Sequence, residues 1–479
     1  MRFGELLNAF HFDETLVGDN PEITGLSFDS RTVEQGDLFF AVQGKNENGA
    51  EYVARARERG AVAVISSTKP KENVPYALTN HVRKCMAKLA AEFYGNAHKR
   101  LKLVAVTGTN GKTTVARTIH HALNISGKTA GVIGTTGVYY ADKYYAPFLT
   151  TPDALFLHRI FADMVKCRVE YAVMEVSAHA LELERVHGLK FAVSILTNLS
   201  QDHLDDFLNM ESYANAKAKL FSGEYTDFAI FNADDDFALN LSRDSSIPSL
   251  TYGLHNPSDA FAIDIKSTLK GTEYVMNLLD FVYRMQTNQI GEYNVSNQLA
   301  AALTLLQLGI PTRDVATALC SNFLVEGRME RVAEVSGATV FVDFAHTPDG
   351  LKKALTALRS VTKGKLVCLF GCGGNRDRDK RAKMGEIAGV LADFTVITSD
   401  NPRYEDPLMI IAEVERGVKK QSKRYVTVQD RRMAISYALE ILSEGDVLLL
   451  AGKGAENYQE IMGVRFPYSD KEYVKELLS

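Results

Sequence analysis

The stretch that decides the fold is residues 104–123, which read VAVTGTNGKTTVARTIHHAL. An apolar run is followed by a glycine-rich turn, and a helical pattern opens at Lys112, so the stretch predicts a strand, a loop and a helix in succession. Gly108 and Gly111 would let backbone N–H groups approach an anion closely, and the helix N-terminus would add its dipole. Lys112 would bring a positive charge to the outer phosphate oxygens. The stretch therefore predicts a loop that binds nucleotide phosphates.

The loop itself, GTNGKTT, predicts ATP as the nucleotide, with the hydroxyl of Thr113 or Thr114 reaching a Mg²⁺ ion. The common pattern has glycine six positions before the lysine, and this chain has Val106 there. A glycine-rich turn between strand and helix that binds no nucleotide is the alternative interpretation. The residues expected to contact the phosphates are Gly108, Thr109, Asn110, Gly111, Lys112, Thr113 and Thr114.

Short apolar, β-branched runs alternate with helical patterns along most of the 479 residues. Continuous rather than alternating apolarity is typical of strands buried on both faces, so we expect α/β domains with parallel sheets. A chain of this length predicts about three domains. We expect a small N-terminal α/β domain at 1–98, a central phosphate-loop domain with a parallel sheet at 99–326, and a Rossmann-like C-terminal α/β domain at 327–479. Examples of the apolar runs are KLVAVTG, YAVMEV, VSILTN, FAIFN, TVFVDFAH, KLVCLFG, FTVITSD and DVLLLAG.

The composition is that of a globular enzyme, with 46% apolar and 24% charged residues. A net charge of -5 gives no reason to expect a nucleic-acid or membrane partner. The first twenty residues lack the continuous apolar core of a signal peptide, and no apolar run approaches the length of a membrane span. The five cysteines form no zinc pattern, and we expect reduced thiols. These features predict a cytoplasmic protein, and we expect a monomer.

Two further candidates follow apolar runs downstream of the loop. Glu175 closes the run YAVMEV, and His203 follows the run VSILTN. Ligands of open α/β sheets bind beyond the carboxyl ends of the strands, where a carboxylate can hold the Mg²⁺ that bridges ATP phosphates. A histidine such as His203, taken alone, is more often structural or exposed than a metal ligand.

The helical stretch 210–221, MESYANAKAKLF, places a lysine among apolar residues. Lys217 falls on the face that carries Tyr213, Ala216 and Leu220, whereas Lys219 points roughly the opposite way. Such a lysine commonly extends its ammonium to solvent. The alternative hypothesis is that CO₂ carbamylates Lys217, which would turn it into an anion suited to a second Mg²⁺.

Ten motifs in order from residue 107 to 459 resemble the Mur ligases, cytoplasmic ATP-dependent amide-forming enzymes of peptidoglycan synthesis. SFDSRTVEQGDLFFAVQG near the start extends the resemblance to nearly the whole chain. The set is most similar to the members that add the third residue of the stem peptide to UDP-N-acetylmuramoyl-L-Ala-D-Glu. The motifs are TGTNGKTT, MEVSAH, TNLSQDHLD, YANAKAKLF, GEYNVSNQLAA, GRMERV, DFAHTPDGL, GCGGNRDRDKR, DNPRYEDP and GKGAENYQ.

The resemblance implies roles at the matching positions. It implies ATP and two Mg²⁺ ions as cofactors, with Thr113, Thr114, Glu175, His203 and carbamylated Lys217 around the metal. Lys112, Lys217, Glu175 and His203 form the implied catalytic set. Further nucleotide contacts are implied for Asn294, Arg328 and Asp343. The UDP-sugar peptide would be bound by Ser30, Thr150, Thr151, Ser177 and Arg185.

Arg403 in DNPRYEDP is the residue that we expect to select the amino acid. meso-Diaminopimelate differs from L-lysine by one distal carboxylate, and a guanidinium binds a carboxylate through two parallel N–H···O bonds. The turn follows the run FTVIT, at the strand end where α/β ligands bind. A solvated surface arginine is the alternative, as is L-lysine as the substrate. The resemblance implies a diaminopimelate site made of Arg376, Asp400, Asn401, Arg403, Gly452 and Glu456.

The implied reaction transfers the γ-phosphoryl group of ATP to the dipeptide carboxylate, and an amine then displaces phosphate from the acyl phosphate. Two alternatives are a folylpolyglutamate synthase, which shares the ATP core, and a nucleotide switch without a covalent product, for which no guanine-reading motif is present. Three motifs depart from the family pattern: the usual SSH has Ala178 at its second position, the usual DHLDYHG reads DHLDDFL, and GKGHE has Ala455 in place of its histidine. None of them removes a phosphate or metal group.

Overall fold

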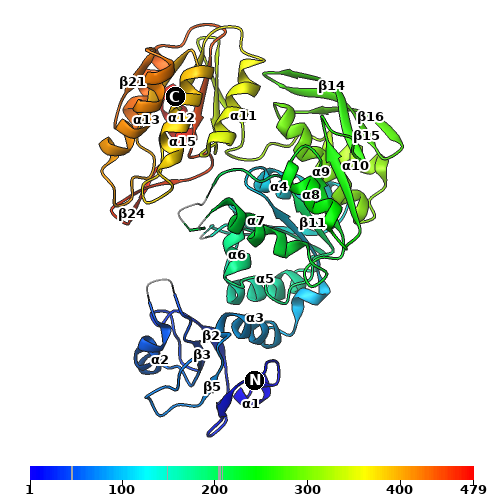
Figure 1. Cartoon of the computed structure of the whole chain (residues 1–479), viewed down its shortest axis with the longest axis vertical. Coiled ribbons are helices and arrows are strands. Elements are labelled where there is room, and N and C mark those ends of the chain that lie inside the picture. The colour runs from blue at the N-terminus through cyan, green and yellow to red at the C-terminus, as the bar shows by residue number, and fades with distance from the viewer. Residues whose placement is uncertain (45–46, 148, 203–205, 208) are drawn as a thin grey trace. The chain divides into compact units, whose positions relative to one another are not determined.

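The computed structural model describes residues 1–44, 47–147, 149–202, 206–207 and 209–479 (Figure 1). The described chain forms two compact units. The first comprises 1–105, 128–194 and 216–228, and the second comprises 106–127, 195–215 and 229–479. Three sheets of five or more strands account for the α/β class that the sequence predicts. The domain boundaries at residues 98 and 326 stay predictions.

The N-terminal sheet of the first unit has the strand order β1-β5-β4-β3-β2. All neighbours are parallel except β1 and β5, and Leu38 of β3 pairs with Ala63 of β4. Residues of β3 alternate between two apolar clusters, because Leu38 and Phe40 pack with α1 and α3 while Phe39 packs with α2. The elements are α1 (Phe3–Leu7), β1 (Glu14–Leu16), β2 (Gly25–Ser27), β3 (Asp37–Phe40), α2 (Val53–Arg59), β4 (Ala63–Ser66), β5 (Tyr76–Leu78) and α3 (Val82–Phe93).

The remainder of the first unit contains the strand order β6-β10-β7-β8-β9. β10 and β7 are parallel, whereas β7, β8 and β9 are antiparallel neighbours. Every residue of β10 and β7 is buried, which matches the continuous apolar runs in the sequence. The elements are β6 (Lys102–Thr107), β7 (Ala130–Gly134), β8 (Gly137–Tyr140), β9 (Lys143–Tyr145), α5 (Ala154–Lys166), β10 (Tyr171–Glu175) and α6 (Ala178–Glu182). Three elements cross a boundary between the units, namely β6, β11 (Val193–Leu196) and α7 (Met210–Ala218).

The second unit carries the strand order β16-β15-β14-β13-β12 and the helix α4 (Lys112–Ile125). β12 (Ala229–Asn232), β13 (Ser249–Gly253) and β14 (Ala260–Thr268) are parallel neighbours. β15 (Gly271–Leu278) and β16 (Phe281–Thr287) extend them as an antiparallel meander, which we did not predict. Burial alternates along β14, because one of its faces is open to solvent. α8 (Asp236–Asp244), α9 (Glu292–Gln307) and α10 (Thr312–Leu319) complete this part.

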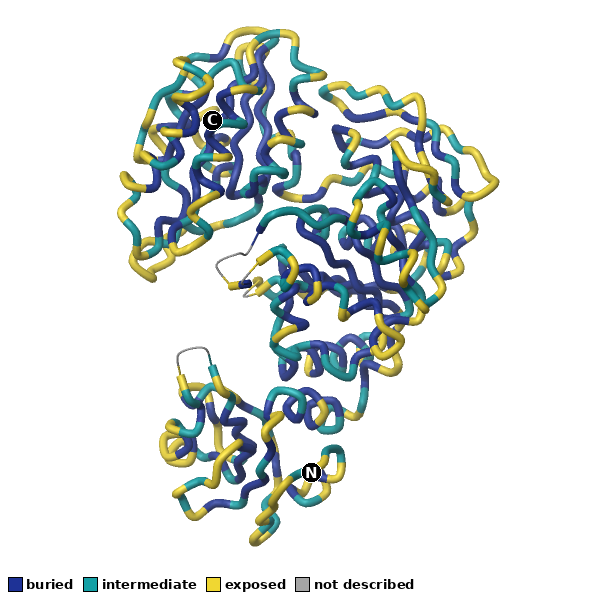
Figure 2. The backbone as a smooth tube through the Cα atoms, in the orientation of Figure 1, coloured by how far each residue is buried: buried dark blue, intermediate teal, exposed yellow. Residues whose placement is uncertain are grey.

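The C-terminal part of the second unit contains the strand order β17-β18-β22-β19-β20-β21, parallel except at β17. Its central strands are buried throughout, as the dark tube in Figure 2 shows. The strands are β17 (Glu330–Val335), β18 (Ala338–Asp343), β19 (Leu366–Phe370), β20 (Phe394–Ile397), β21 (Tyr425–Thr427) and β22 (Val447–Ala451), with a hairpin of β23 (Tyr458–Ile461) and β24 (Val464–Pro467). The helices are α11 (Pro348–Arg359), α12 (Asp379–Leu391), α13 (Pro407–Gln421), α14 (Arg431–Glu440) and α15 (Asp470–Leu478).

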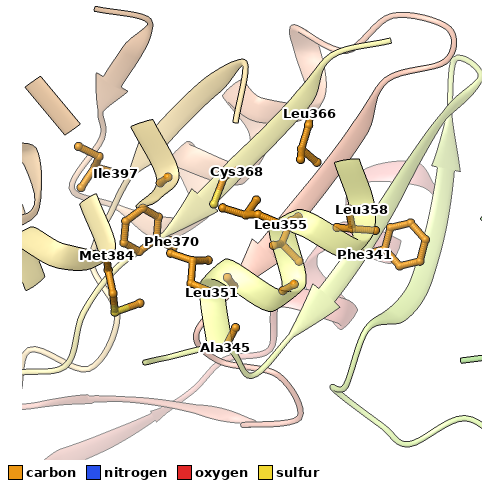
Figure 3. Close-up of a cluster of buried hydrophobic side chains, with 14 of the residues drawn as sticks. Phe341, Ala345, Leu351, Leu355, Leu358, Leu366, Cys368, Phe370, Met384 and Ile397 are labelled. Atoms are coloured by element: carbon orange, nitrogen blue, oxygen red, sulfur yellow. The ribbon is translucent and has the colours of Figure 1, made fainter. Parts of the chain in front are cut away.

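Two apolar clusters lie on opposite faces of this sheet. Cys368 and Phe370 of β19 pack against α11, α12 and α13, and Figure 3 shows them beside Leu351 and Leu355 of α11. Leu369 of the same strand packs against α14 and α15. Because β18, β19, β20 and β22 are parallel, their carboxyl ends lie at one edge of the sheet. That edge carries the segments after Asp343, Phe370, Ile397 and Ala451.

None of the helices in the described part of the chain is long and apolar enough to cross a bilayer. All five cysteines are free thiols, as the sequence predicts.

Candidate functional site

The phosphate loop adopts a conformation that requires both of its glycines. Gly108 and Gly111 have φ angles of +137° and +87°, a region that L side chains rarely adopt. A Cβ on Gly108 would lie 1.9 Å from Oγ1 of Thr197, and a Cβ on Gly111 would lie 2.6 Å from Oδ1 of Asn297. Val106, which stands where the common pattern has its first glycine, is fully buried within β6. The loop therefore begins two residues later, at Gly108.

Lys112 is the first residue of α4, and its ammonium lies against the loop. Nζ donates to the carbonyl oxygens of Gly108 and Thr109 at 2.9 and 2.8 Å. No side chain caps the N-terminus of α4 at Gly111. The loop therefore combines a fixed cation with the backbone N–H groups of a helix N-terminus, a combination that binds phosphate.

The segment after β11 supports the loop. Backbone N of Asn110 donates to Oδ1 of Asn198 at 3.0 Å, and the hydroxyl of Thr109 donates to the carbonyl of Ser200 at 3.1 Å. Oγ1 of Thr197 donates to the carbonyl of Asn110 at 2.6 Å. The TNLS part of the motif TNLSQDHLD thus holds the shape of the phosphate loop, a role that we did not predict.

Residues far along the chain also contact the loop. Nη2 of Arg328 donates to Oγ1 of Thr113 at 2.9 Å, and Nδ2 of Asn110 donates to Oδ2 of Asp349 at 2.9 Å. The guanidinium of Arg328 stacks on the ring of Phe344 at 4.4 Å. The structure therefore brings the predicted nucleotide contact Arg328 to the phosphate loop.

The other two predicted nucleotide contacts are buried. Asp343, the last residue of β18, accepts bonds from the backbone N of Met329 at 2.6 Å and of Ala345 at 2.8 Å. Burial raises the pKa of Asp343, although the nearby Arg328 opposes that rise. The amide of Asn294 donates to the carbonyl of Ile290 and accepts from Asn297, at 2.9 and 3.1 Å.

Glu175 lies at the carboxyl end of β10, where the sequence predicts a ligand. It is 1% exposed, and its Oε1 and Oε2 accept bonds from the backbone N and the hydroxyl of Thr135 at 2.8 and 3.1 Å. The hydroxyls of Thr135 and Thr150 are 3.2 Å apart. A Cβ on Gly134 would lie 2.1 Å from Oε1, so the backbone of β7 packs directly on this carboxylate.

Four predicted contacts for the UDP-sugar peptide come together in the first unit. Oγ1 of Thr151 accepts from the backbone N of Ser177 at 3.0 Å, and Nη1 of Arg185 donates to the carbonyl of Thr151 at 2.8 Å. Ser177 caps α6. Burial lowers the pKa of Arg185. Thr150 is the fourth of these residues, and its hydroxyl contacts that of Thr135. The fifth predicted contact, Ser30, is buried in the segment after β2 of the N-terminal sheet.

Helical spacing predicts that Lys217 and Lys219 lie on different faces of the helix and leaves open whether the ammonium of Lys217 reaches solvent. Lys217 is 1% exposed in α7, among buried residues that include Tyr213 and Leu220. Lys219 is half exposed and pairs with Glu182 at 2.6 Å. His203 lies outside the described residues. Among the residues that are described, no group of three or more His, Cys, Asp or Glu side chains forms a metal cluster.

The predicted amino-acid site lies after β20 and β22. Asp400 and Asn401 are buried, and Nδ2 of Asn401 donates to Oε2 of Glu456 at 2.9 Å. Burial alone would raise the pKa of Asp400. The positive charges of Lys453 and Arg431 outweigh that effect, so its pKa lies below the ordinary value. The structure brings together Asp400, Asn401 and Glu456.

Arg403 has a φ angle of +51°, uncommon for a residue other than glycine and often associated with functional sites. Its Nη1 donates to the carbonyl of Gly374 at 2.8 Å, and its Nε lies 3.5 Å from Oε2 of Glu460. A Cβ on Gly373 would lie 2.9 Å from Nη1 of Arg403 and 3.8 Å from Cγ of Arg376. Both predicted arginines therefore lie beside one glycine of the 371–376 loop.

Three further residues of the candidate sites were not predicted. Thr135 contacts Glu175, and Glu460 contacts Arg403. Lys453 contacts Glu456 and the distant Asn401. The sequence signal available was the motif GKGAENYQ, which contains Lys453 between two glycines.

Comparison with known proteins gives three matches to family profiles. The Mur ligase family, catalytic domain, matches residues 22–94. The Mur ligase middle domain matches residues 106–305. The Mur ligase, glutamate ligase domain, matches residues 327–454.

Individual proteins match over nearly the whole chain. UDP-N-acetylmuramoyl-L-alanyl-D-glutamate--2,6-diaminopimelate ligase of Geobacillus thermodenitrificans is 43% identical over 451 residues, covering 93% of this chain and 92% of that protein. A solved structure of a ligase with the same name has a TM-score of 0.70 at 33% identity, covering 99% of this chain and 98% of that one. Mycobacterium tuberculosis folylpolyglutamate synthase complexed with ADP has a TM-score of 0.64 at 18% identity, covering 76% and 90%, and shares the fold.

Proposed function

Because the chain belongs to the Mur ligase family, we propose that it joins meso-diaminopimelate to UDP-N-acetylmuramoyl-L-Ala-D-Glu at the expense of ATP. ADP and phosphate are the other products. The observation that carries the proposal is the 43% identity with a ligase of that name across 93% of this chain. In this proposal the phosphate loop would bind ATP, and the group around Arg403 would bind the amino acid.

The chemistry begins with a carboxylate, which does not react with an amine at neutral pH because its oxygen is a poor leaving group. Transfer of the γ-phosphoryl group to the dipeptide carboxylate gives an acyl phosphate, and the amine then displaces phosphate through a tetrahedral intermediate. Catalysis consists mainly of positioning and of offsetting negative charge. Lys112 and the N-terminus of α4 would hold the β- and γ-phosphates, and Arg328 would add a second cation near Thr113.

The proposed donors are of the type that suits Mg²⁺, which prefers oxygen ligands. Thr113, Thr114, Glu175 and a carbamate on Lys217 offer oxygens, and His203 is the remaining candidate. Bound Mg²⁺ would offset the repulsion between the polyphosphate and the anionic acceptor. The burial of Lys217 supports the carbamate, because a dry site favours the neutral amine that must react with CO₂.

The amino-acid end of the site has groups for both charges of the distal end of diaminopimelate. Arg403, with Arg376 beside it, would take the carboxylate, and Glu456 with the carbonyl of Gly452 would take the ammonium. L-Lysine would leave Arg403 without its anion, so this site favours diaminopimelate. We also propose that the enzyme acts as a cytoplasmic monomer on small-molecule substrates.

A test of the reaction class is whether ATP turnover depends on both other substrates. We expect ADP release only when UDP-N-acetylmuramoyl-L-Ala-D-Glu and diaminopimelate are both present. ADP release without either substrate would support a nucleotide switch, and turnover with a folate and glutamate would support a folylpolyglutamate synthase.

A further inference from the structure

We propose that Lys453 is a positioning residue that fixes the carboxylate of Glu456 for the distal ammonium and helps to set the preference for a zwitterionic distal end. The inference rests on the proposed function and deepens it, because it concerns how the amino-acid site distinguishes its substrate. Nothing in the sequence motif alone assigned Lys453 a role.

The ammonium of Lys453 contacts three residues of the predicted amino-acid site. The residue is fully buried, and its Nζ donates to Oδ1 of Asn401 at 2.9 Å and to Oε2 of Glu456 at 3.0 Å. Oδ1 of Asp400 is 3.6 Å from the same nitrogen. A buried ammonium needs anionic or polar partners, and these three all belong to the predicted site. The ring centroid of Tyr458 lies 5.8 Å from the same nitrogen.

These bonds determine the orientation of Asn401. Its Oδ1 accepts from Lys453 and from the backbone N of Glu460 at 2.9 Å, and its Nδ2 donates to Glu456. A flipped amide would direct its NH₂ group at two donors, which is unfavourable. Lys453 therefore fixes the amide, and the amide in turn helps to fix Glu456.

Glu456 is held through one oxygen only. Oε2 accepts from both Lys453 and Asn401, and among the described residues Oε1 accepts no hydrogen bond. The side chain is 23% exposed, so Oε1 is the oxygen that a ligand can reach. The geometry assigns Oε1 to the distal ammonium of the amino acid.

The backbone around Lys453 is suited to turning this side chain inward. Gly452 and Gly454 have φ angles of +108° and +51°, and a Cβ on Gly452 would lie 2.7 Å from Oδ2 of Asp400. Glycine at both flanking positions lets β22 end in a bend under the site. The ammonium of Lys453 and the backbone of Gly452 therefore both lie close to the carboxylate of Asp400.

Lys453 also balances charge. It is in contact with two carboxylates, Asp400 and Glu456, and its removal would leave these two anions with one cation fewer. A more negative site attracts an amino acid with a single distal positive charge, such as L-lysine. It gives less advantage to diaminopimelate, whose distal carboxylate and ammonium cancel.

The test compares Lys453→Met, which keeps the length of the side chain without its charge, with the wild-type enzyme. We expect the KM for diaminopimelate to rise at least tenfold, and the KM values for ATP and the UDP-linked dipeptide to stay within twofold. We also expect the ratio of kcat/KM for diaminopimelate to that for L-lysine to fall at least tenfold. A folded variant with an unchanged KM for diaminopimelate, or with all three KM values raised equally, would overturn the inference.

Val447→Ala, at the opposite end of β22, is the control for a general loss of stability, and its KM values should match the wild type. If Lys453→Met does not fold, Lys453→Gln removes the charge but retains a donor, so it is judged by the ratio of kcat/KM for diaminopimelate to that for L-lysine, which should fall at least tenfold; an unchanged ratio would overturn the inference. The outcomes separate the two proposals. Wild-type enzyme that ligates no diaminopimelate refutes the proposed function, whereas active wild-type enzyme with indifferent Lys453 variants refutes only the role of Lys453.

Discussion

Replacement of Arg403 should remove most of the discrimination between diaminopimelate and L-lysine. A guanidinium that binds a carboxylate forms two charge-assisted hydrogen bonds, each contributing about 1.5–3 kcal/mol. The side chain of Arg403 is 20% exposed and Glu460 lies 3.5 Å from its Nε, so solvent and a competing anion reduce the total. We expect a net effect of about 3 kcal/mol, which corresponds to roughly a hundredfold change in relative kcat/KM.

The choice of replacement matters because Arg403 has a positive φ angle. Alanine there carries a backbone cost of about 1–2 kcal/mol that Arg403 itself already bears, whereas asparagine adopts this conformation more readily. Arg403→Asn is therefore the preferred variant, and Arg403→Ala should show the same change in selectivity with a melting temperature below that of Arg403→Asn.

The assay measures kcat/KM for each amino acid with the other substrates saturating. We expect the KM for diaminopimelate to rise steeply in both variants, with that for L-lysine little changed. Variants that retain the wild-type ratio between the two amino acids would show that Arg403 is not the selector.

Three further predictions concern the lysines proposed to act in catalysis and the stability of the first unit. Lys112→Ala should abolish ligation in a steady-state assay because the phosphates lose their fixed cation; wild-type turnover would show that the phosphate-loop assignment is wrong. Lys217→Ala should lose activity and recover part of it with short carboxylic acids, whereas Lys219→Ala, which breaks an exposed ion pair of about 1 kcal/mol at most, should be mild. Burial lowers the pKa of His98 to about 4 and of His158 to about 3 from an ordinary 6.5, so the unfolded chain binds protons that the folded chain excludes. Stability should therefore be complete above pH 6.5 and fall by about 1.4 kcal/mol per pH unit per histidine as the pH drops toward 4. Melting curves of a His98→Asn, His158→Gln double variant should be flatter between pH 6.5 and 5, and an unchanged slope would contradict the assignment.

The strands that the sequence predicts best are those buried on both faces. In β19 (Leu366–Phe370) each residue is apolar, because alternate side chains enter the clusters on the two faces of the sheet. Helical spacing also predicted that Lys217 lies on the apolar face of α7, but it left open whether the ammonium extends to solvent, and the structure shows the residue buried. Local periodicity predicted the strand and the helix face without any long-range contact.

The parts that were not predicted depend on long-range pairing or on a weak local pattern. The meander of β14, β15 and β16 has one solvated face, so its apolar residues alternate and no continuous run marks it. Glu460 and Arg403 are 57 positions apart, and only the pairing of their backbones brings them together. Lys453 gives no local sign that its ammonium is buried, because Asp400 and Asn401 follow β20, which β19 separates from β22 in the sheet.

The central claim is tested most directly by the mass of the product formed from UDP-N-acetylmuramoyl-L-Ala-D-Glu, ATP and Mg²⁺ with an equimolar mixture of meso-diaminopimelate and L-lysine. The account predicts a product that carries diaminopimelate almost exclusively, with one ADP and one phosphate released for each amide bond. A product that carries mainly lysine would contradict the specificity assigned to Arg403, and the absence of any ligated product would contradict the proposed function.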